Sequence, residues 1–289
     1  MSQFELGPAL LFCPADRPDR YAKALQRADA VILDLEDGVA PADREEAREA
    51  LIAHPTDPQR TIVRVNPAGT DDHERDLHAL ARTELRFVML AKTEHPSDLN
   101  ALAQFEVMAL CETARGVAFA REIAAVPCVS ALMWGAEDLF VSLGGSASRF
   151  ADGQYRAAAS YARSTVLIAA AASGKAAIDA VFLDIPNVAG LAAEVADAAA
   201  CGFAATACIH PSQVETVRDG YAPAAAELEF ARAVLAAAES EPGVFAFRGG
   251  MVDQPVLSLA RRTLARAERQ GASQIGQLTE EDDGVEAQE

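Results

Sequence analysis

Short apolar runs recur along the chain, separated by charged, alanine-rich segments. Most runs are rich in Val, Ile, Leu and Phe and lack strict alternation with polar side chains. Such runs are typical of parallel strands that are buried on both faces. Eight of them are expected as strands: Ala9–Pro14, Ala30–Asp37, Thr61–Asn66, Arg86–Lys92, Glu106–Glu112, Ser130–Asp138, Ala180–Ile185 and Ala205–Pro211.

The segments between the runs carry apolar side chains at helical spacing. Pro41 and Pro96 stand where helices are expected to begin, and Gly202 follows the last helix as a stop signal. Alternation of eight strands with helices predicts a (β/α)8 TIM barrel, an α/β fold, with an open doubly wound sheet as the alternative. No Gly-x-Gly-x-x-Gly follows the first run, which weakens the dinucleotide-binding form of that alternative. The expected helices are Asp43–Ala53, Asp71–Arg82, Ala114–Ala125, Tyr155–Ala172 and Val188–Ala200.

The chain continues beyond the eighth run. Two more helical stretches, Ala224–Ser240 and Pro255–Gln270, flank a glycine-rich link at Gly243–Val252. We therefore expect a barrel over residues 1–223, a C-terminal helical lid over residues 224–272 and an acidic disordered tail over residues 273–289.

Charge and cysteine content restrict the partners and the compartment. Forty-three acidic and 25 basic side chains give a net charge of -18, which repels nucleic acid and anionic membranes. The five cysteines include no Cys-x-x-Cys pair, so reduced thiols in an intracellular compartment are expected. The N-terminus lacks the pattern of a signal peptide, and the alanine-rich stretch at 157–172 is shorter than the ~20 apolar residues of a membrane span. A cytoplasmic protein is expected.

Ionisable or amide groups end five of the eight expected strands. Glu36-Asp37 ends the second, Asn66 the third after Arg64, Lys92 the fourth, Glu112 the fifth and Glu137-Asp138 the sixth. In a barrel these ends meet at one mouth, where barrel enzymes carry out their chemistry. Ordinary solvation or ion pairing would explain any single end, but five together indicate a site.

Several carboxylates at one mouth repel one another unless a cation compensates. Arg64 and Lys92 supply part of the positive charge. Oxygen ligands favour Mg²⁺ or Mn²⁺ over Zn²⁺, and no His pair or Cys cluster has zinc spacing. A basic group follows the first strand and is a candidate for gripping a phosphorylated ligand, with a solvated helix face as the alternative; it comprises Arg17, Arg20, Lys23 and Arg27.

The motifs at these positions resemble those of a known family. They are LFCPADRPDRYAKA, ADAVILDLEDGVAP, TIVRVN, VMALCETARG, MWGAEDL, CIHPSQ and the late GGMVDQPV. Together they cover the chain from about residue 10 to residue 269 and resemble the citrate lyase β-subunit-like proteins of the HpcH/HpaI aldolase and malyl-CoA lyase superfamily. LDLEDGV and CIHPSQ are the specific parts of the resemblance.

The resemblance implies roles for individual residues. Glu112 and Asp138 match the two Mg²⁺-binding carboxylates, and Glu36 and Asp37 match an acidic pair that reaches the metal through its waters. Arg64 matches the arginine that grips the carboxylate of the keto acid.

Other roles follow from the same match. Asp253 matches an acid/base aspartate on a C-terminal lid that often serves a neighbouring subunit; its glycine-rich surroundings alone would make it a turn residue. Gly135 and Ala136 are expected to contact the substrate, and Arg17, Arg20 and Lys23 to approach the CoA moiety.

The activity implied is Mg²⁺-dependent, reversible aldol-type cleavage of a carboxylated 3-hydroxyacyl-CoA to acetyl-CoA and a keto acid. Citramalyl-CoA, citryl-CoA, malyl-CoA and 3-hydroxy-3-methylglutaryl-CoA all fit this description. A homotrimer is the family expectation.

Two other activities remain open from the sequence. One is a subunit of a citrate lyase complex that acts on an acyl-carrier-protein thioester. The other is a metal-free class I aldolase in which Lys92 forms a Schiff base, although neighbouring carboxylates would hold this lysine protonated.

Overall fold

The computed structural model describes residues 4–241 and 243–283 of the 289-residue chain. The chain divides into two compact units, Met1–Arg218 and Asp219–Glu289. The division falls within helix α9 (Val214–Tyr221), a few residues before the expected end of the barrel at residue 223.

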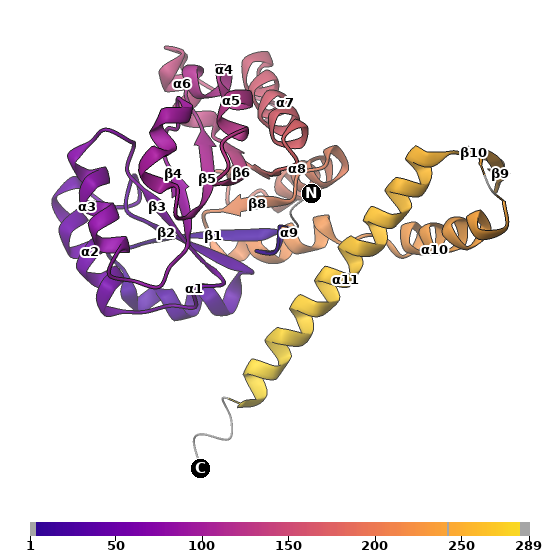
Figure 1. Ribbon diagram of the computed structural model, residues 1–289, viewed down its shortest axis with the longest axis horizontal. Coiled ribbons are helices and arrows are strands. Elements are labelled where there is room, and N and C mark those ends of the chain that lie inside the picture. Colours follow the sequence, from indigo (N-terminus) through magenta and orange to yellow (C-terminus); the bar gives the residue numbers. More distant parts are fainter. Residues whose placement is uncertain (1–3, 242, 284–289) are drawn as a thin grey trace. The chain divides into compact units, whose positions relative to one another are not determined.

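The first unit is a closed barrel, with eight strands among the described residues and every neighbouring pair parallel (Figure 1). The barrel closes where β1 pairs with β8, which excludes the open doubly wound sheet and confirms the TIM barrel. The strands are β1 (Ala9–Pro14), β2 (Ala30–Asp34), β3 (Thr61–Val65), β4 (Phe87–Leu90), β5 (Glu106–Cys111), β6 (Val129–Trp134), β7 (Ala176–Asp179) and β8 (Ala205–Cys208).

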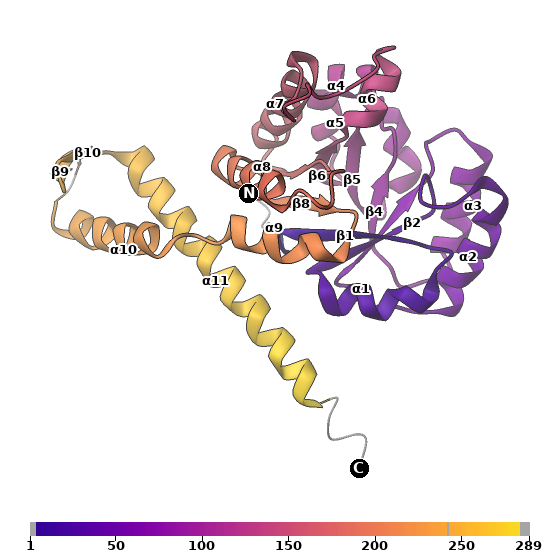
Figure 2. The ribbon, with the colours of Figure 1, turned by 180° about the vertical axis from the view of Figure 1, so that it is seen from behind.

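Helices surround the barrel (Figure 2). The expected helices are found to within a few residues, although the one expected over Ala114–Ala125 is two short helices and the connection from β4 to β5 is a 3-10 helix at Pro96–Leu102. Residues 136–138 were expected to end the sixth strand but belong to a helix instead. The α-helices of this unit before α9 are α1 (Tyr21–Arg27), α2 (Arg44–Ala53), α3 (Asp71–Leu80), α4 (Ala114–Ala118), α5 (Ala120–Ala124), α6 (Ala136–Ser142), α7 (Ala157–Ala172) and α8 (Val188–Cys201).

Side chains from all eight strands fill the barrel interior. They include Leu10, Ile32, Ile62, Met89, Met108, Leu110, Met133, Ile178 and Ala207. Residues two apart on a strand share a face, so Met108 and Leu110 both point inward. The interior is therefore a packed core, and chemistry is confined to the strand ends.

The seventh strand does not lie where the apolar pattern predicts it. The expectation was Ala180–Ile185, because this segment has the bulkier side chains, whereas the strand is Ala176–Asp179. The shorter segment makes the backbone pairs with β6 and β8 that close the ring, and Phe182 lies beyond it, its carbonyl accepting from Gln213 Nε2 at 2.7 Å. The position of the seventh strand is therefore set by the backbone pairing that closes the barrel, and the size of the side chains does not decide it.

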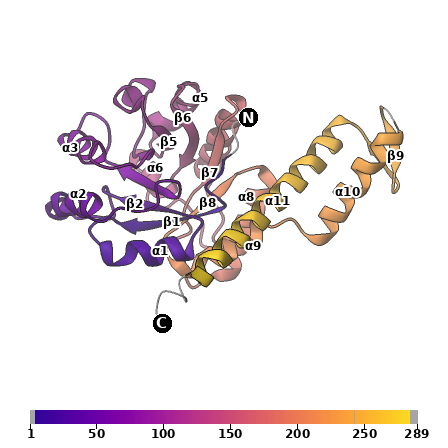
Figure 3. The ribbon, with the colours of Figure 1, turned by 60° about the horizontal axis from the view of Figure 1, so that its bottom comes forward.

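The second unit is a helical pair joined by a hairpin (Figure 3). Helix α10 (Ala225–Ser240) and helix α11 (Gln254–Asp283) flank strands β9 (Phe245–Phe247) and β10 (Gly250–Val252). The hairpin turns at Arg248 and Gly249, with φ values of 46° and 83°, as a two-residue turn with two left-handed residues requires. Ala231, Val234 and Leu257 lie in the apolar cluster of this unit.

Helix α11 continues further than the sequence predicts. It runs to Asp283, beyond the expected helix end at Gln270, and residues 284–289 of the expected tail lie outside the described residues. No described helix is both long enough and apolar enough to cross a membrane.

Candidate active site

On three strands, the row of side chains that points into the barrel ends with a charged residue at the mouth. Interior residues of β2, β3 and β5 are followed, two positions later, by an ionisable residue of the same face. These residues are Asp34, Arg64 and Glu112, and all three are buried. The packed core therefore gives way to a charged layer at the carboxyl ends of the strands.

Lys92, which follows β4, gathers the carboxylates predicted at the mouth. Its Nζ donates to Glu36 Oε1 at 2.5 Å and to Asp37 Oδ2 at 3.2 Å. It also lies 3.3 Å from Asp138 Oδ1 and 4.0 Å from Glu112 Oε1. Four carboxylates, from the ends of β2 and β5 and from the start of α6, thus surround one point, as the strand-end pattern predicts.

The protonation of Lys92 argues against the Schiff-base alternative. Burial alone would lower the pKa of its ammonium, but the hydrogen bond that it donates to Glu36 and the charges of Glu112 and Asp138 outweigh burial, and the pKa is raised. A Schiff base needs the neutral amine as nucleophile. The residue therefore acts as a cation that compensates the carboxylates.

Glu112 is, with Glu36, one of the two buried carboxylates among the four. Its side chain is 5% exposed, and burial together with the charge of Asp138 raises its pKa to about 8. The backbone N–H of Lys92 donates to Glu112 Oε1 at 3.1 Å from a left-handed backbone with φ of 48°. The charge of Glu112 is thus only partly compensated, which favours binding of a further cation.

The start of helix α6 is shaped around Glu112. Gly135 precedes the helix, and a Cβ on it would lie 2.8 Å from Glu112 Oε2. Ala136 is the first helical residue and is buried, and Asp138 follows in the first turn with a side chain 32% exposed. The absence of a side chain at Gly135 lets this turn approach Glu112 closely.

These oxygens fit a hard divalent cation. Within residues 4–241 and 243–283, no three His, Cys, Asp or Glu side chains form a ready-made metal cage. Mg²⁺ does not need such a cage, because it commonly binds through one or two carboxylates and keeps several waters. Two carboxylates at Glu112 and Asp138, with Glu36 and Asp37 nearby, match that mode.

Arg64 is held by a residue that the sequence analysis did not single out. Asp34 accepts from Arg64 Nε at 2.7 Å and from Nη2 at 2.6 Å, while Nη1 lies 3.3 Å from Glu36 Oε2. The guanidinium also stacks over the Phe12 ring, at 4.9 Å from its centroid. Arg64 is therefore fixed beside the carboxylates, as a group that binds an anion requires.

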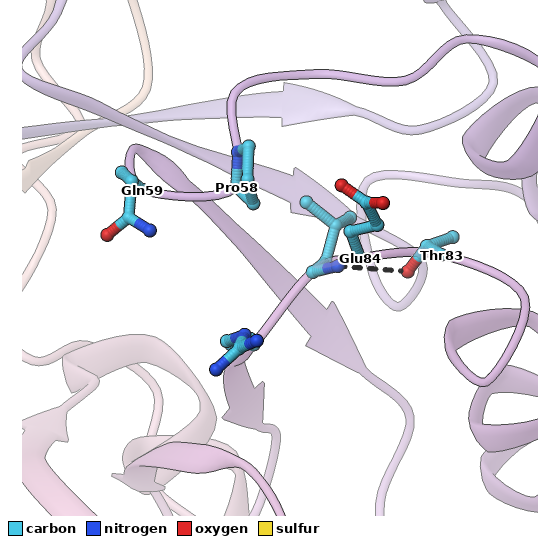
Figure 4. Close-up of a pocket in the computed structure, with 6 residues that line it drawn as sticks. Pro58, Gln59, Thr83 and Glu84 are labelled. Carbon is cyan, nitrogen blue, oxygen red and sulfur yellow. Dashed lines mark hydrogen bonds between the residues drawn. The ribbon is translucent and has the colours of Figure 1, made fainter.

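Open space adjoins Lys92 on the side of β3, β4 and β5. A pocket of ≈ 390 Å³ is lined by Pro67, Ala68, Lys92, Glu94, His95, Asp98, Thr113 and Arg115. A second depression, of ≈ 560 Å³, lies before the starts of β3 and β4 and is lined by Pro58, Gln59, Thr83, Glu84, Leu85 and Arg86 (Figure 4). Chemistry in barrels takes place at the carboxyl ends, so of these two pockets the one beside Lys92 is the candidate for the substrate.

The predicted basic group does not form one helix face. Arg17 precedes the 3-10 turn at Pro18–Arg20 in non-helical conformation and pairs with Asp19 at 3.0 Å. Lys23 lies in helix α1 and is exposed. The change from 3-10 to α geometry breaks the i, i+3, i+6 spacing, although all three residues follow the carboxyl end of β1.

Asp253 belongs to the second unit and immediately precedes helix α11. The N–H of Val256 donates to Asp253 Oδ1 at 3.3 Å, and the N–H of Leu257 donates to its carbonyl at 3.1 Å. The side chain is partly exposed. These contacts are those of a helix N-cap, which is a sufficient structural reason for an aspartate at this position. Its catalytic role therefore stays a proposal.

Comparison with known proteins identifies the family. The family model for HpcH/HpaI aldolase/citrate lyase matches residues 9–211, and the model for the C-C bond lyase of the TIM-barrel fold matches residues 154–272. The first match spans the whole barrel and more than half of the chain. The chain belongs to the HpcH/HpaI aldolase/citrate lyase family.

Individual members of this family are similar over nearly their full length. A citrate lyase subunit beta-like protein of Mycobacterium tuberculosis is 57% identical over 261 residues, or 90% of this chain and 96% of the relative. A (3S)-malyl-CoA thioesterase of Cereibacter sphaeroides is 33% identical, over 90% of this chain and 94% of the relative. The crystal structure of protein CitE from M. tuberculosis with magnesium, acetoacetate and coenzyme A has a TM-score of 0.87 and 56% identity, over 91% of this chain and 98% of that one.

Membership of the HpcH/HpaI family confirms that the protein is an enzyme of the lyase class, as its motifs indicate. The barrel brings Glu36, Asp37, Glu112 and Asp138 together as the strand-end pattern requires, with Arg64 beside Glu36. Asp34 was missed, although it lies on the same strand face as the interior residue Ile32, and that parity could have revealed it.

Proposed function

We propose that the protein is a Mg²⁺-dependent lyase that cleaves a carboxylated 3-hydroxyacyl-CoA to acetyl-CoA and a keto acid. The observation that carries the proposal is the group of four carboxylates around one point beside the buried Arg64. The M. tuberculosis relative that binds magnesium, acetoacetate and coenzyme A together supports the ligand classes.

The metal would be held by Glu112 and Asp138, with Glu36 and Asp37 reaching it through waters; Mn²⁺ suits the same oxygens. When bound, it would stabilise the alkoxide that forms on the hydroxyl oxygen as its proton is removed, before the carbon–carbon bond breaks. Lys92 remains a counter-charge to the surrounding carboxylates, with its strongest contact at Glu36.

Arg64 orients the substrate. Its guanidinium presents two parallel N–H groups to a carboxylate, which fixes the plane of the keto acid where lysine would offer only a point charge. Gly135 lets the start of helix α6 approach Glu112 closely, and Gly135 and Ala136 would contact the substrate there. Arg17, Arg20 and Lys23 follow the carboxyl end of β1 in the chain and would attract the phosphates of CoA against the net charge of -18.

Asp253 is the proposed carrier of a proton. A base must take the proton of the substrate hydroxyl, and an acid must protonate the thioester enolate that leaves as acetyl-CoA. Asp253 stands at the end of a glycine-containing hairpin, on a unit separate from the barrel. This placement suits a lid that carries the group to a site, in its own subunit or in a neighbour within a homotrimer.

A panel of thioesters tests the proposal. The protein, freed of metal with EDTA, is incubated with citramalyl-, citryl-, malyl- and 3-hydroxy-3-methylglutaryl-CoA, with and without MgCl2, and keto acid, acetyl-CoA and free CoA are measured. Equal release of keto acid and acetyl-CoA that requires MgCl2 is expected, and Glu112→Gln should abolish it. Free CoA without keto acid would show thioester hydrolysis instead, and activity only on an acyl-carrier-protein ester would support the citrate lyase complex.

Co-expression tests the lid across subunits. Asp253→Asn and Glu112→Gln are each expected to be inactive for different reasons. If the lid serves a neighbouring subunit, mixed oligomers regain activity because one interface then pairs an intact lid with an intact metal site. No recovery in mixed oligomers, with their composition verified by mass spectrometry, would assign each lid to its own barrel.

A further inference from the structure

Asp34 accepts four hydrogen bonds, and the proposed function assigns it no role. It is the last residue of β2, pairs in register with Arg64 on β3 and has a side chain 4% exposed. Its two oxygens accept from Arg64 Nε and Nη2, and also from the backbone N–H groups of Glu36 at 2.9 Å and Gly38 at 2.7 Å. One carboxylate therefore uses all of its main acceptor positions.

The contact with Arg64 selects which edge of the guanidinium faces the site. Asp34 takes the edge formed by Nε and Nη2, so a ligand can meet the edge formed by Nη1 and the second N–H of Nη2, where Nη1 also lies 3.3 Å from Glu36 Oε2. The Phe12 ring covers one face of the group at 4.9 Å. An arginine without these contacts would keep several rotamers and could turn either edge toward a ligand.

The same carboxylate shapes the turn that presents the acidic pair. Its bonds to the N–H groups of Glu36 and Gly38 close the chain around Asp34 immediately after the strand. A Cβ on Gly38 would lie 2.3 Å from Asp34 Oδ2, so the turn can close only on glycine. Glu36, presented by this turn, contacts both Arg64 and Lys92.

We propose that Asp34 is a positioning residue for substrate recognition. It holds Arg64 so that one defined edge of the guanidinium receives the substrate carboxylate, and it connects Arg64 to the turn that bears Glu36. This inference rests on the proposed function, in which Arg64 binds the carboxylate. It predicts that keto-acid affinity depends on Asp34 although Asp34 itself does not touch the ligand.

The rival explanation is a purely structural ion pair, and the barrel supplies a matched control for it. Asp179 is the last residue of β7, is buried and accepts bidentately from Arg163, with contacts of 2.7 to 3.1 Å. Arg163 belongs to helix α7 and also pairs with Asp197 on helix α8. Asp179→Asn thus removes the same kind of pair at the same point of a strand, away from Arg64.

The test measures binding of pyruvate in the presence of MgCl2 by isothermal titration calorimetry, together with thermal unfolding. Asp34→Asn is expected to weaken pyruvate binding roughly 10- to 100-fold, the range for loss of a charge-assisted hydrogen bond. Asp179→Asn is expected to lower the melting temperature comparably while pyruvate affinity stays within about twofold of wild type. Equal affinity in Asp34→Asn and wild type would overturn the inference.

A double-mutant cycle separates positioning from general damage. Once Arg64→Lys has removed the guanidinium, Asp34→Asn should change pyruvate affinity less than about twofold further, because the two residues act as one unit. Fully multiplicative effects would assign Asp34 a structural role and overturn the inference.

Gly38→Ala provides a second variant in case Asp34→Asn does not fold. Its added Cβ displaces Asp34 Oδ2 from the exposed side of the turn and leaves the charge in place. It should weaken pyruvate binding in the same direction, and unchanged affinity would contradict the inference. Failure of wild type to bind any of pyruvate, oxaloacetate and acetoacetate would instead overturn the proposed function, and the inference with it.

Discussion

Replacement of Lys92 by methionine tests how the negative charge of the four carboxylates is compensated. The ammonium lies 2.5 to 4.0 Å from oxygens of four carboxylates, among them both expected metal ligands. A divalent cation bound to the same oxygens is repelled by the ammonium, so Lys92 and Mg²⁺ compete for the cluster. Lys92→Met should therefore bind Mg²⁺ more tightly, even if turnover falls.

The magnitude follows from the geometry. A Mg²⁺ at about 2 Å from Asp138 Oδ1 lies no more than roughly 5.4 Å from Nζ, because Nζ is 3.3 Å from that oxygen. At this distance a double and a single charge repel by about 1.5 kcal/mol at the dielectric constant of water. This choice is conservative for side chains that are 27% and 32% exposed. Removal of the ammonium should tighten Mg²⁺ binding roughly tenfold.

Calorimetric titration of EDTA-treated protein with MgCl2 measures this effect directly. Lys92→Arg is the matched control, because it retains the positive charge and should bind Mg²⁺ with an affinity near that of wild type. Equal or weaker Mg²⁺ binding by Lys92→Met, with the protein folded, would refute the competition. Trapping of a substrate adduct on Lys92 by borohydride, with activity insensitive to EDTA, would refute the metal mechanism altogether.

Further outcomes concern the metal and the lid. Asp253→Asn should retain Mg²⁺ and pyruvate binding but lose about 10²- to 10⁴-fold in kcat, and near wild-type turnover would exclude it as the proton carrier. Burial and the Asp138 charge raise the pKa of Glu112 from 4.5 to about 8 in the metal-free protein, so Mg²⁺ must displace a proton below this pH. Apparent Mg²⁺ affinity in calorimetry should fall about tenfold per pH unit below 8 and level off above it; a flat profile between pH 6 and 8 would contradict the raised pKa. Gly135→Ala places a Cβ 2.8 Å from Glu112 Oε2 and should weaken Mg²⁺ binding about tenfold or more, whereas Gly144→Ala, with open space around its Cβ despite a φ of 69°, should leave it unchanged.

The sequence by itself determined the barrel and most of the mouth. Buried parallel strands need continuous apolar runs, and strand ends in a barrel converge, so Glu112, Asp138 and Lys92 could be assigned to one site before any coordinates. The role of each residue within that site could not be predicted in this way, because no pattern of apolar spacing distinguishes a metal ligand from a carboxylate that reaches the metal through water. Those roles came from the family motifs.

Tertiary structure decided what depends on pairing between distant segments. β7 lies at Ala176–Asp179 because the backbone partners in β6 and β8 select it, although the next segment has the bulkier side chains. Asp34 gains its significance only when β2 and β3 lie in register and bring it against Arg64. Apolar periodicity specifies which face of a strand is buried, whereas the register between strands and the angle of each charged group are set by contacts across the barrel that no local pattern encodes.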